Sequence, residues 1–354
     1  MLARQLLLAR EPVTPVAAIE RLAGLQAQQA RPPFIGLWSR LARFTREDLL
    51  KVLHARTVIR VTAMRGTLHL ISARDYLGWR GPLQPALDRG ITSIVGAALA
   101  ELDMAAAERA TRELLARAPA TFDAIRDHLA PAFPNANVRQ VAYAIRMSLP
   151  LVQVPERETE WGFPGAADFA LADAWLRKKV SATASSPKDL IRRYLAAFGP
   201  ASVTDAQTWS GLTKLGPVFE ELRPTLVTFQ DERKRELFDL PDAPRPDADT
   251  PAPVRFLPEF DNLILGHQDR TRVISEEHRL RITSPNLLVP ATLLVDGMVA
   301  GVWAIERKKR EATLVIEPFV TIPVKRKSEL REEAERLLVF SETEVTSHAV
   351  KFKA

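Results

Sequence analysis

The sequence predicts an α+β fold, with about three winged-helix motifs in tandem followed by a β-rich C-terminal domain. Stretches whose apolar residues recur at helical spacing are repeatedly followed by runs of β-branched residues, which are typical of hairpins. The length of 354 residues, of which 46% are hydrophobic, allows two or more domains with buried cores. The last hundred residues change character and are dominated by strand-like segments.

The first predicted unit, residues 1–100, places helices before a hairpin. Residues 16–25 have helical spacing, and a following pair of prolines interrupts the helix. Thr45 is expected to begin a further helix, because acidic residues follow this hydroxyl in the first turn. Residues 58–71 are rich in β-branched side chains around a central Arg-Gly pair, which predicts a β-hairpin.

The same order of elements returns in residues 101–180 and 181–240. The second unit is expected to contain helices over 122–129, capped by Thr121, and 135–149, and wing strands over 151–154 and 160–163. The third unit is expected to contain helices over 189–198, 206–211 and 214–222, and a strand over 225–229. The repetition lies in the order of elements and not in sequence identity, which indicates a tandem array.

Residues 241–354 form the predicted linker and C-terminal domain. The segment 239–253 is rich in proline and aspartate, which is typical of a linker. Strands are expected over 291–295, 299–307 and 313–316, with Asp296-Gly297 as a hairpin turn, and a helix over 328–340.

The composition excludes several classes of protein. Because the chain has no cysteine, it has no disulfide, iron–sulfur cluster or thiol nucleophile. The six histidines show no paired metal-binding spacing, and the glycines form no dinucleotide or triphosphate motif. No apolar run approaches the ~20 residues of a membrane span. We therefore expect no cofactor, no metal, no membrane partner and a cytoplasmic, nucleoid-associated location.

The basic charge is concentrated at the start of the chain. Residues 1–100 contain 14 lysines and arginines against six acidic residues, whereas the remaining residues contain 35 against 37. A basic region attached to a near-neutral remainder suits binding to a phosphate backbone. An arginine-rich composition that merely reflects genomic base content would give the same excess, and charge alone leaves both interpretations open.

Several segments resemble one family when they are taken together and in order. They are 25–28 with 31–40, 65–70, 198–200, 257–265 with 269–270, and the hairpin 296–301. This chain resembles the AlkZ/AlkX (YcaQ) family of winged-helix DNA glycosylases over nearly its whole length. The resemblance implies tandem winged helices, a β-rich C-terminal domain and excision of bulky N7-alkylated guanine from double-stranded DNA. It also implies unhooking of crosslinks, or self-resistance to DNA-alkylating antibiotics, in some members. We expect a monomer.

The resemblance also implies the catalytic residues. The family's motif is Gln-Φ-Gln in the AlkZ branch, and this chain has Gln26-Ala27-Gln28, so Gln26 and Gln28 are expected to be catalytic. A glutamine is not a base at neutral pH, but its amide can orient a water molecule. That suffices for guanine alkylated at N7, because the base is already cationic and leaves neutral. The competing interpretation is that these glutamines belong to an ordinary polar helix surface.

Further residues are candidates for the site. Those expected to contact DNA are Arg31, Arg40, Arg43, Lys51, Arg56, Arg60, Arg65, Thr67 and His69. Trp38, Asp261 and Asn262 are candidates for lining the site. Each has a structural alternative: His69 as a hydrogen-bonded wing histidine, Trp38 as a core residue and Asp261 as a helix cap.

Two other functions compete with base excision. Winged helices often belong to non-catalytic transcriptional regulators, and a drug-sequestering resistance protein is a third interpretation. A regulator needs one wing and usually a dimerisation or ligand module, whereas three units in one chain could surround a lesion. This contrast favours the glycosylase.

Overall fold

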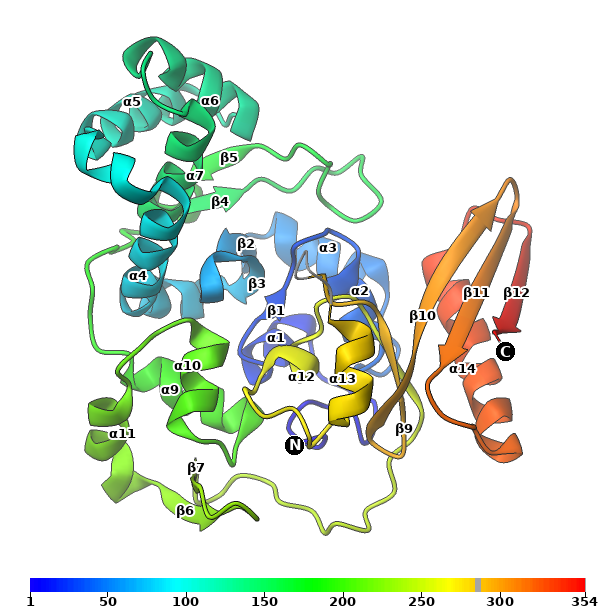
Figure 1. Ribbon diagram of the computed structural model, residues 1–354. Coiled ribbons are helices and arrows are strands. Elements are labelled where there is room, and N and C mark those ends of the chain that lie inside the picture. The colour runs from blue at the N-terminus through cyan, green and yellow to red at the C-terminus, as the bar shows by residue number, and fades with distance from the viewer. Residues whose placement is uncertain (284–287, 354) are drawn as a thin grey trace.

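A computed structural model describes residues 1–283 and 288–353 (Figure 1). The mixed α+β class is confirmed. Three times along the chain, helices are followed by two paired strands, and a separate five-stranded sheet comes last. The number of winged helices stays a prediction. Helices α5–α7 lie at one end of the molecule, and the C-terminal strands with α14 lie at another side.

The first unit follows the predicted order. Its helices are α1 (Pro15–Arg21), α2 (Pro32–Trp38) and α3 (Arg46–His54), and its strands are β1 (Leu25–Gln26), β2 (Val58–Thr62) and β3 (Leu68–Ser72). The predicted hairpin is confirmed, since β2 and β3 are antiparallel. At the start of α3 the Asp48 carboxylate accepts the Thr45 backbone N–H at 2.8 Å, which satisfies a donor that the helix cannot.

The strands of the first two units form one sheet, in the order β1-β3-β2-β4-β5. Here β4 (Leu151–Gln153) lies antiparallel to β2 and pairs Gln153 with Arg60, while β5 (Phe169–Leu171) completes the far edge. The backbone pairing of β2 with β4 therefore joins the two units through one sheet. The glutamine segment lies at the opposite edge, in β1.

A 23-residue helix, α4 (Ala73–Val95), lies between these units, where the sequence analysis assigns no element. It contains Pro82 and Pro85, and proline in a helix interior removes a hydrogen bond. Tertiary packing outweighs this cost: Trp79 is buried, and Arg80 donates at 2.9 Å to the carbonyls of Met147 and Ser148 at the end of α7.

The second unit contains α5 (Met104–Arg117), α6 (Phe122–Leu129) and α7 (Val138–Ser148). Thr121 caps α6 as predicted, and accepts the Ala124 N–H at 3.1 Å. The expected wing strand over 160–163 is wrong, because the strand that pairs with β4 is β5. Gly162 has a φ of +75° in a turn, and Trp161 packs edge-on against Phe34 at 5.2 Å.

The third unit begins after the short helix α8 (Ala172–Leu176). It contains α9 (Lys188–Phe198), α10 (Val203–Ser210), α11 (Gly216–Leu222), β6 (Val227–Gln230) and β7 (Glu236–Asp239). These elements agree with the predicted ones to within a few residues, apart from the closing strand β7, which the sequence analysis omits. Ser202 caps α10 with Asp205 as its reciprocal partner.

The C-terminal sheet has the order β12-β11-β10-β9-β8. Its strands are β8 (Arg255–Leu257), β9 (Thr292–Val295), β10 (Met298–Lys308), β11 (Glu311–Pro318) and β12 (Ser347–Phe352), and its helices are α12 (Asn262–Leu265), α13 (Glu276–Ile282) and α14 (Val324–Ser341). The predicted Asp296-Gly297 turn joins β9 to β10, and both residues have positive φ. The pairing of β12 parallel to β11 lies outside the predicted elements.

Two buried ion pairs tie distant parts of the chain together. Arg4 binds Asp239 with two hydrogen bonds of 2.7 Å, which attaches the N-terminus to the third unit. Arg40, just after α2, binds Asp261 with two hydrogen bonds of 2.8 Å. This pair attaches the first unit to the C-terminal domain. All four side chains are at most 1% exposed, so neither pair is screened by water.

Among the described residues, no single helix is long and apolar enough to cross a membrane. The bent pair Ala73–Glu101 and Met104–Arg117, with 111° between its parts, passes that test by length and composition only.

Asp261→Asn is expected to lower the free energy of unfolding by about 3–5 kcal/mol, because it leaves the Arg40 charge buried without a counter-ion. Urea denaturation measures the change. The control is Glu221→Gln, which breaks the exposed Lys188–Glu221 pair and should cost less than about 1 kcal/mol. Equal losses in the two variants would contradict a special role for the buried pair.

Candidate functional site

The glutamine motif lies on extended chain at the edge of the first sheet. Gln26 ends β1 and pairs with His69 of β3, and the Ala27 N–H continues the pairing by donating to the Leu68 carbonyl at 2.7 Å. The next helix, α2, begins only at Pro32. The interpretation as an ordinary polar helix surface is therefore wrong, because the motif lies outside any helix.

Arg65 holds the Gln26 side chain, which is only 8% exposed. One guanidinium nitrogen, Nη2, donates to Gln26 Oε1 at 2.7 Å, and another donates to the Trp209 carbonyl of the third unit. Because arginine has donors only, this contact fixes which end of the Gln26 amide is the oxygen. Burial, with a contribution from Arg270, lowers the pKa of Arg65 to about 10, so it remains cationic at neutral pH.

Asn262 holds the backbone of the same segment from the opposite side. Its Nδ2 donates to the Gly24 carbonyl at 2.5 Å, and its Oδ1 accepts the Gln26 N–H at 3.4 Å. Its neighbour Asp261 caps α12 by accepting the Leu263 N–H at 3.0 Å, which confirms the cap interpretation of Asp261. The C-terminal domain thus positions the strand that carries Gln26.

His69 lies beside Gln26 in the sheet but is fully buried. Its Nδ1 lies 3.0 Å from the Thr67 carbonyl, while burial and the charge of Arg65 lower its pKa to about 3, so the ring is neutral. The expectation that His69 contacts DNA is contradicted by this burial, and the hydrogen-bonded wing histidine is the better description.

Gln28 is exposed and lines a cleft of about 590 Å³. Its Oε1 lies 3.5 Å from the Leu68 N–H, at the limit of a hydrogen bond. The cleft extends from Gln28 and Arg60 of the first unit to Tyr143 and its neighbours on α7, and the loop 163–167 forms a further wall. It therefore lies between the first two units, whose strands share the sheet.

Arg60 joins the glutamine segment to this cleft. Its Nε donates to the Ala27 carbonyl at 2.9 Å and its Nη2 to the Gln28 carbonyl at 3.1 Å, while its guanidinium lies 4.9 Å from the Phe163 ring centre. Burial, with a smaller contribution from the like charge of Arg146, lowers the pKa of Arg60 to about 10.

The cleft carries excess positive charge. Arg60, Arg139 and Arg146 line it, together with a single acidic residue, Asp123. Asp123 is already paired with Arg126, whose Nη1 lies 2.6 Å from its carboxylate. An anionic ligand is the group that such a lining accommodates.

Sequence reasoning missed the contribution of α7 to this cleft. Arg139, Tyr143 and Arg146 follow one another at intervals of four and three residues, which places them on one helix face. That spacing is the feature of the sequence that could have identified these three residues as neighbours on one helix face. The net positive charge of the sequence lies in residues 1–100, so the charge distribution alone does not indicate α7.

Two other expectations are corrected by burial and packing. Arg40 is fully buried in its pair with Asp261 and also donates to the Gln5 and Gly36 carbonyls, so it does not contact DNA. Trp38 packs against Phe340 at 5.9 Å, which is the core interpretation, and it does not line the cleft.

The remaining predicted basic residues do not gather at the cleft. Arg31 pairs with Glu342, and Arg56 donates to the Trp175 carbonyl at 2.9 Å. Arg43 and Lys51 are exposed, and each lies at a different hollow. Thr67 donates to the Met64 carbonyl at 3.1 Å, within the turn that carries Arg65. Of the basic residues predicted to contact DNA, Arg60 is the one that lines this cleft, and DNA contact by the exposed Arg43 and Lys51 stays a prediction.

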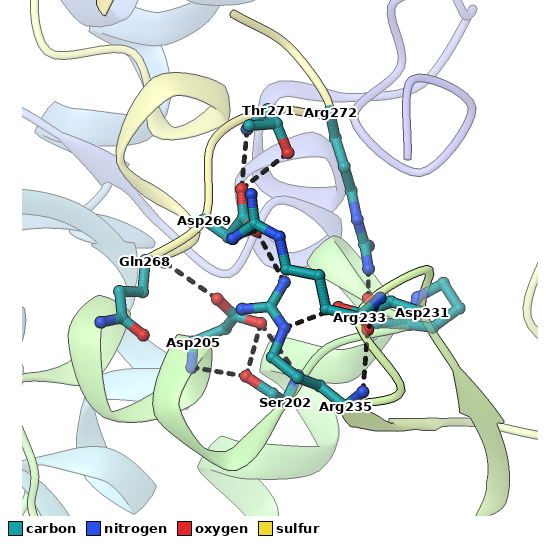
Figure 2. A network of polar contacts seen from close by, with 10 residues as sticks. Ser202, Asp205, Asp231, Arg233, Arg235, Gln268, Asp269, Thr271 and Arg272 are labelled. Carbon is teal, nitrogen blue, oxygen red and sulfur yellow. Dashed lines mark hydrogen bonds and ion pairs between the residues drawn. The ribbon is translucent and has the colours of Figure 1, made fainter. Parts of the chain in front are cut away.

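A larger hollow, of about 630 Å³, lies at the third unit and is lined by side chains of both charges. Figure 2 shows its polar network, in which side chains of α10, the β6–β7 turn and the segment 268–272 meet. Arg235 pairs with Asp231 and Asp269 at 2.6 Å each, and the Gln268 N–H donates to Asp205 at 2.9 Å. Arg233 also lies 3.4 Å from Asp269, so the ion pairs of this hollow join Arg233 and Arg235 to Asp231 and Asp269.

Comparison with known proteins agrees with this architecture. The sequence model of the family "DNA glycosylase AlkZ-like" matches residues 19–340. A curated relative, the "Interstrand DNA cross-link repair glycosylase" of Streptomyces sahachiroi, is 26% identical over 337 residues, which cover 89% of this chain and 88% of the relative. The solved structure of "Streptomyces sahachiroi DNA glycosylase AlkZ" superposes with a TM-score of 0.79 at 22% identity, covers 99% of this chain and 97% of its own, and shows the same fold. The chain belongs to the AlkZ-like family of DNA glycosylases.

Proposed function

We propose that this DNA glycosylase is monofunctional and hydrolyses the N-glycosidic bond of N7-alkylated guanine. The observation that supports the proposal most directly is the position of Gln28, which is exposed at the edge of a positively charged cleft. Gln26, two residues earlier, is held in one orientation by Arg65. Double-stranded DNA that contains the alkylated guanine is the proposed partner, bound by a monomer.

The chemistry follows from what the two amides can do. A carbonyl oxygen has two lone pairs, so the oxygens of Gln26 and Gln28 can each accept one further hydrogen bond from a water molecule. In the proposed step, such a water attacks the sugar C1′, the C1′–N9 bond breaks, and the proton that the water loses passes to solvent. The amides contribute orientation and dipoles but no proton transfer. A guanine that is alkylated at N7 carries a positive charge and leaves neutral, so this site needs no acid.

The proposal extends to crosslinked guanine. The Streptomyces sahachiroi relative is named for repair of interstrand crosslinks, and a crosslink through N7 leaves the same cationic purine to be released. A biological role in DNA repair, or in self-resistance to an alkylating agent, follows from this substrate. We propose that the damaged nucleotide binds in the cleft between the first two units, which has a volume of about 590 Å³.

Gln28→Ala and Gln26→Ala are expected to lower the single-turnover rate of base excision by about 100-fold each, because a water that is no longer oriented attacks rarely. The substrate is a duplex with one N7-methylguanine, and abasic sites are counted after alkaline treatment. Gln230→Ala, which removes an exposed amide on β6 outside the cleft, is the matched control. Full activity in both glutamine variants would refute the mechanism.

The same assay separates the competing functions. A transcriptional regulator or a drug-sequestering protein would generate no abasic sites from the wild-type chain, even with excess protein. A glycosylase generates them in the presence of a chelator as well as without it.

Asn262→Ala is expected to lower the excision rate about tenfold and to leave DNA affinity unchanged, because Asn262 holds the backbone of Gln26 from outside the cleft. Rates at saturating enzyme and dissociation constants measure the two effects separately. An equal loss in rate and affinity would point to general disruption of the fold instead.

The excision rate is expected to stay flat between about pH 6 and pH 9. The glutamines do not titrate, the lowered pKa of His69, about 3, keeps its ring neutral, and Arg65, with a pKa of about 10, keeps its charge. A rate profile over this range at constant ionic strength checks the prediction. A bell-shaped profile would reveal an acid or base that the mechanism lacks.

A further inference from the structure

One face of α7 presents a planar ring between two guanidinium groups inside the cleft. The Arg139 guanidinium lies 5.9 Å from the Tyr143 ring centre, and that of Arg146 lies 5.0 Å from it. Phe122 of α6 packs against the other part of Tyr143 at 4.7 Å. The ring is therefore held by the second unit's own core, and it restricts both arginines to one side of the cleft.

The two arginines of α7 lack a counter-ion in the protein. Within residues 1–283 and 288–353, neither Arg139 nor Arg146 forms an ion pair with a carboxylate. The Nε of Arg146 is buried and has no hydrogen-bond partner in that part of the chain. A buried guanidinium donor without an acceptor is costly unless a ligand supplies one.

The charges around Arg139 and Arg146 do not supply the missing counter-ion. Asp123 is the acidic residue at the cleft, and it is occupied by Arg126. On the opposite wall, Arg60 is close enough for the charge of Arg146 to lower its pKa, in addition to the effect of burial. Three cationic side chains line this cleft with Asp123 as the acidic residue among its lining, and this excess of positive charge favours an anion with several oxygens.

We propose that Arg139 and Arg146 form a clamp on the DNA backbone, in which each guanidinium binds a phosphate beside the nucleotide that faces Gln28. The inference rests on the proposed function, because Gln28 and the clamp line the same cleft. The first unit supplies the reacting glutamines, and the second unit supplies the phosphate contacts. Tyr143 is the positioning residue that holds the two guanidinium groups apart.

The test uses the full chain and measures binding to an unmodified 20-base-pair duplex by fluorescence anisotropy at several salt concentrations. Arg139→Gln and Arg146→Gln should each weaken binding about tenfold and lower the slope of log affinity against log salt by about one. Arg146→Lys should keep the salt slope, because it keeps the charge, but lose part of the affinity. The control, Arg112→Gln, removes an exposed arginine of α5 outside the cleft and should change neither.

A second measurement separates binding from chemistry. At enzyme concentrations below the dissociation constant, both arginine variants should excise the base about tenfold more slowly than wild type, in proportion to their loss of affinity. At saturating enzyme, the single-turnover rate should recover most of this loss, because the clamp acts through binding. If Arg146→Gln fails to fold, as judged by circular dichroism, the test rests on Arg139→Gln, because Arg139 is exposed.

The outcomes distinguish the clamp from the proposed activity. Wild-type excision together with unchanged binding in both arginine variants would overturn the clamp and leave the activity standing. Absence of wild-type excision together with weakened binding in the variants would support the clamp and refute the proposed activity. If Arg112→Gln lowers the slope of log affinity against log salt by the same amount, the clamp is overturned. An exposed arginine outside the cleft would then contribute as much to DNA binding as Arg139 or Arg146.

Discussion

A buried ion pair between Arg40 and Asp261 joins two parts of the chain that lie 221 positions apart. Both charges are out of water, so each depends on the other for its stability. Because Asp261 also caps α12, the pair determines where Asn262 stands, and Asn262 in turn holds the backbone around Gln26. The C-terminal domain, distant in sequence, thereby becomes part of the glutamine site.

The site combines an immobile part with an accessible part. Gln26 is buried, and Arg65 fixes its amide, whereas Gln28 faces the cleft. Neutral amides suit such a place, since a carboxylate beside Arg60 and Arg65 would be drawn into an ion pair instead of orienting water. Under the proposed function, the two amides supply orientation and no proton transfer, which suits a substrate whose leaving group needs no proton.

Local signals in the sequence were sufficient for much of the fold. The cap at Thr121, the turn at Asp296-Gly297 and the cap role of Asp261 depend on neighbouring residues, and all three are confirmed. The helix α4 and the burial of Arg40 depend on partners far along the chain, which no local pattern reveals. The glutamine motif was identified through the family resemblance, whereas the arginines of α7 were overlooked because the charge count favoured the first hundred residues.

The strand β1 is only two residues long, and it covers the edge of β3 in the first sheet. Uncovered strand edges recruit other chains, and short strands that soon turn away are one means of preventing this. The segment that carries Gln26 therefore also covers the backbone of β3 at Leu70 and His69. A change that releases β1 from the sheet would expose this part of the β3 backbone to pairing with another chain.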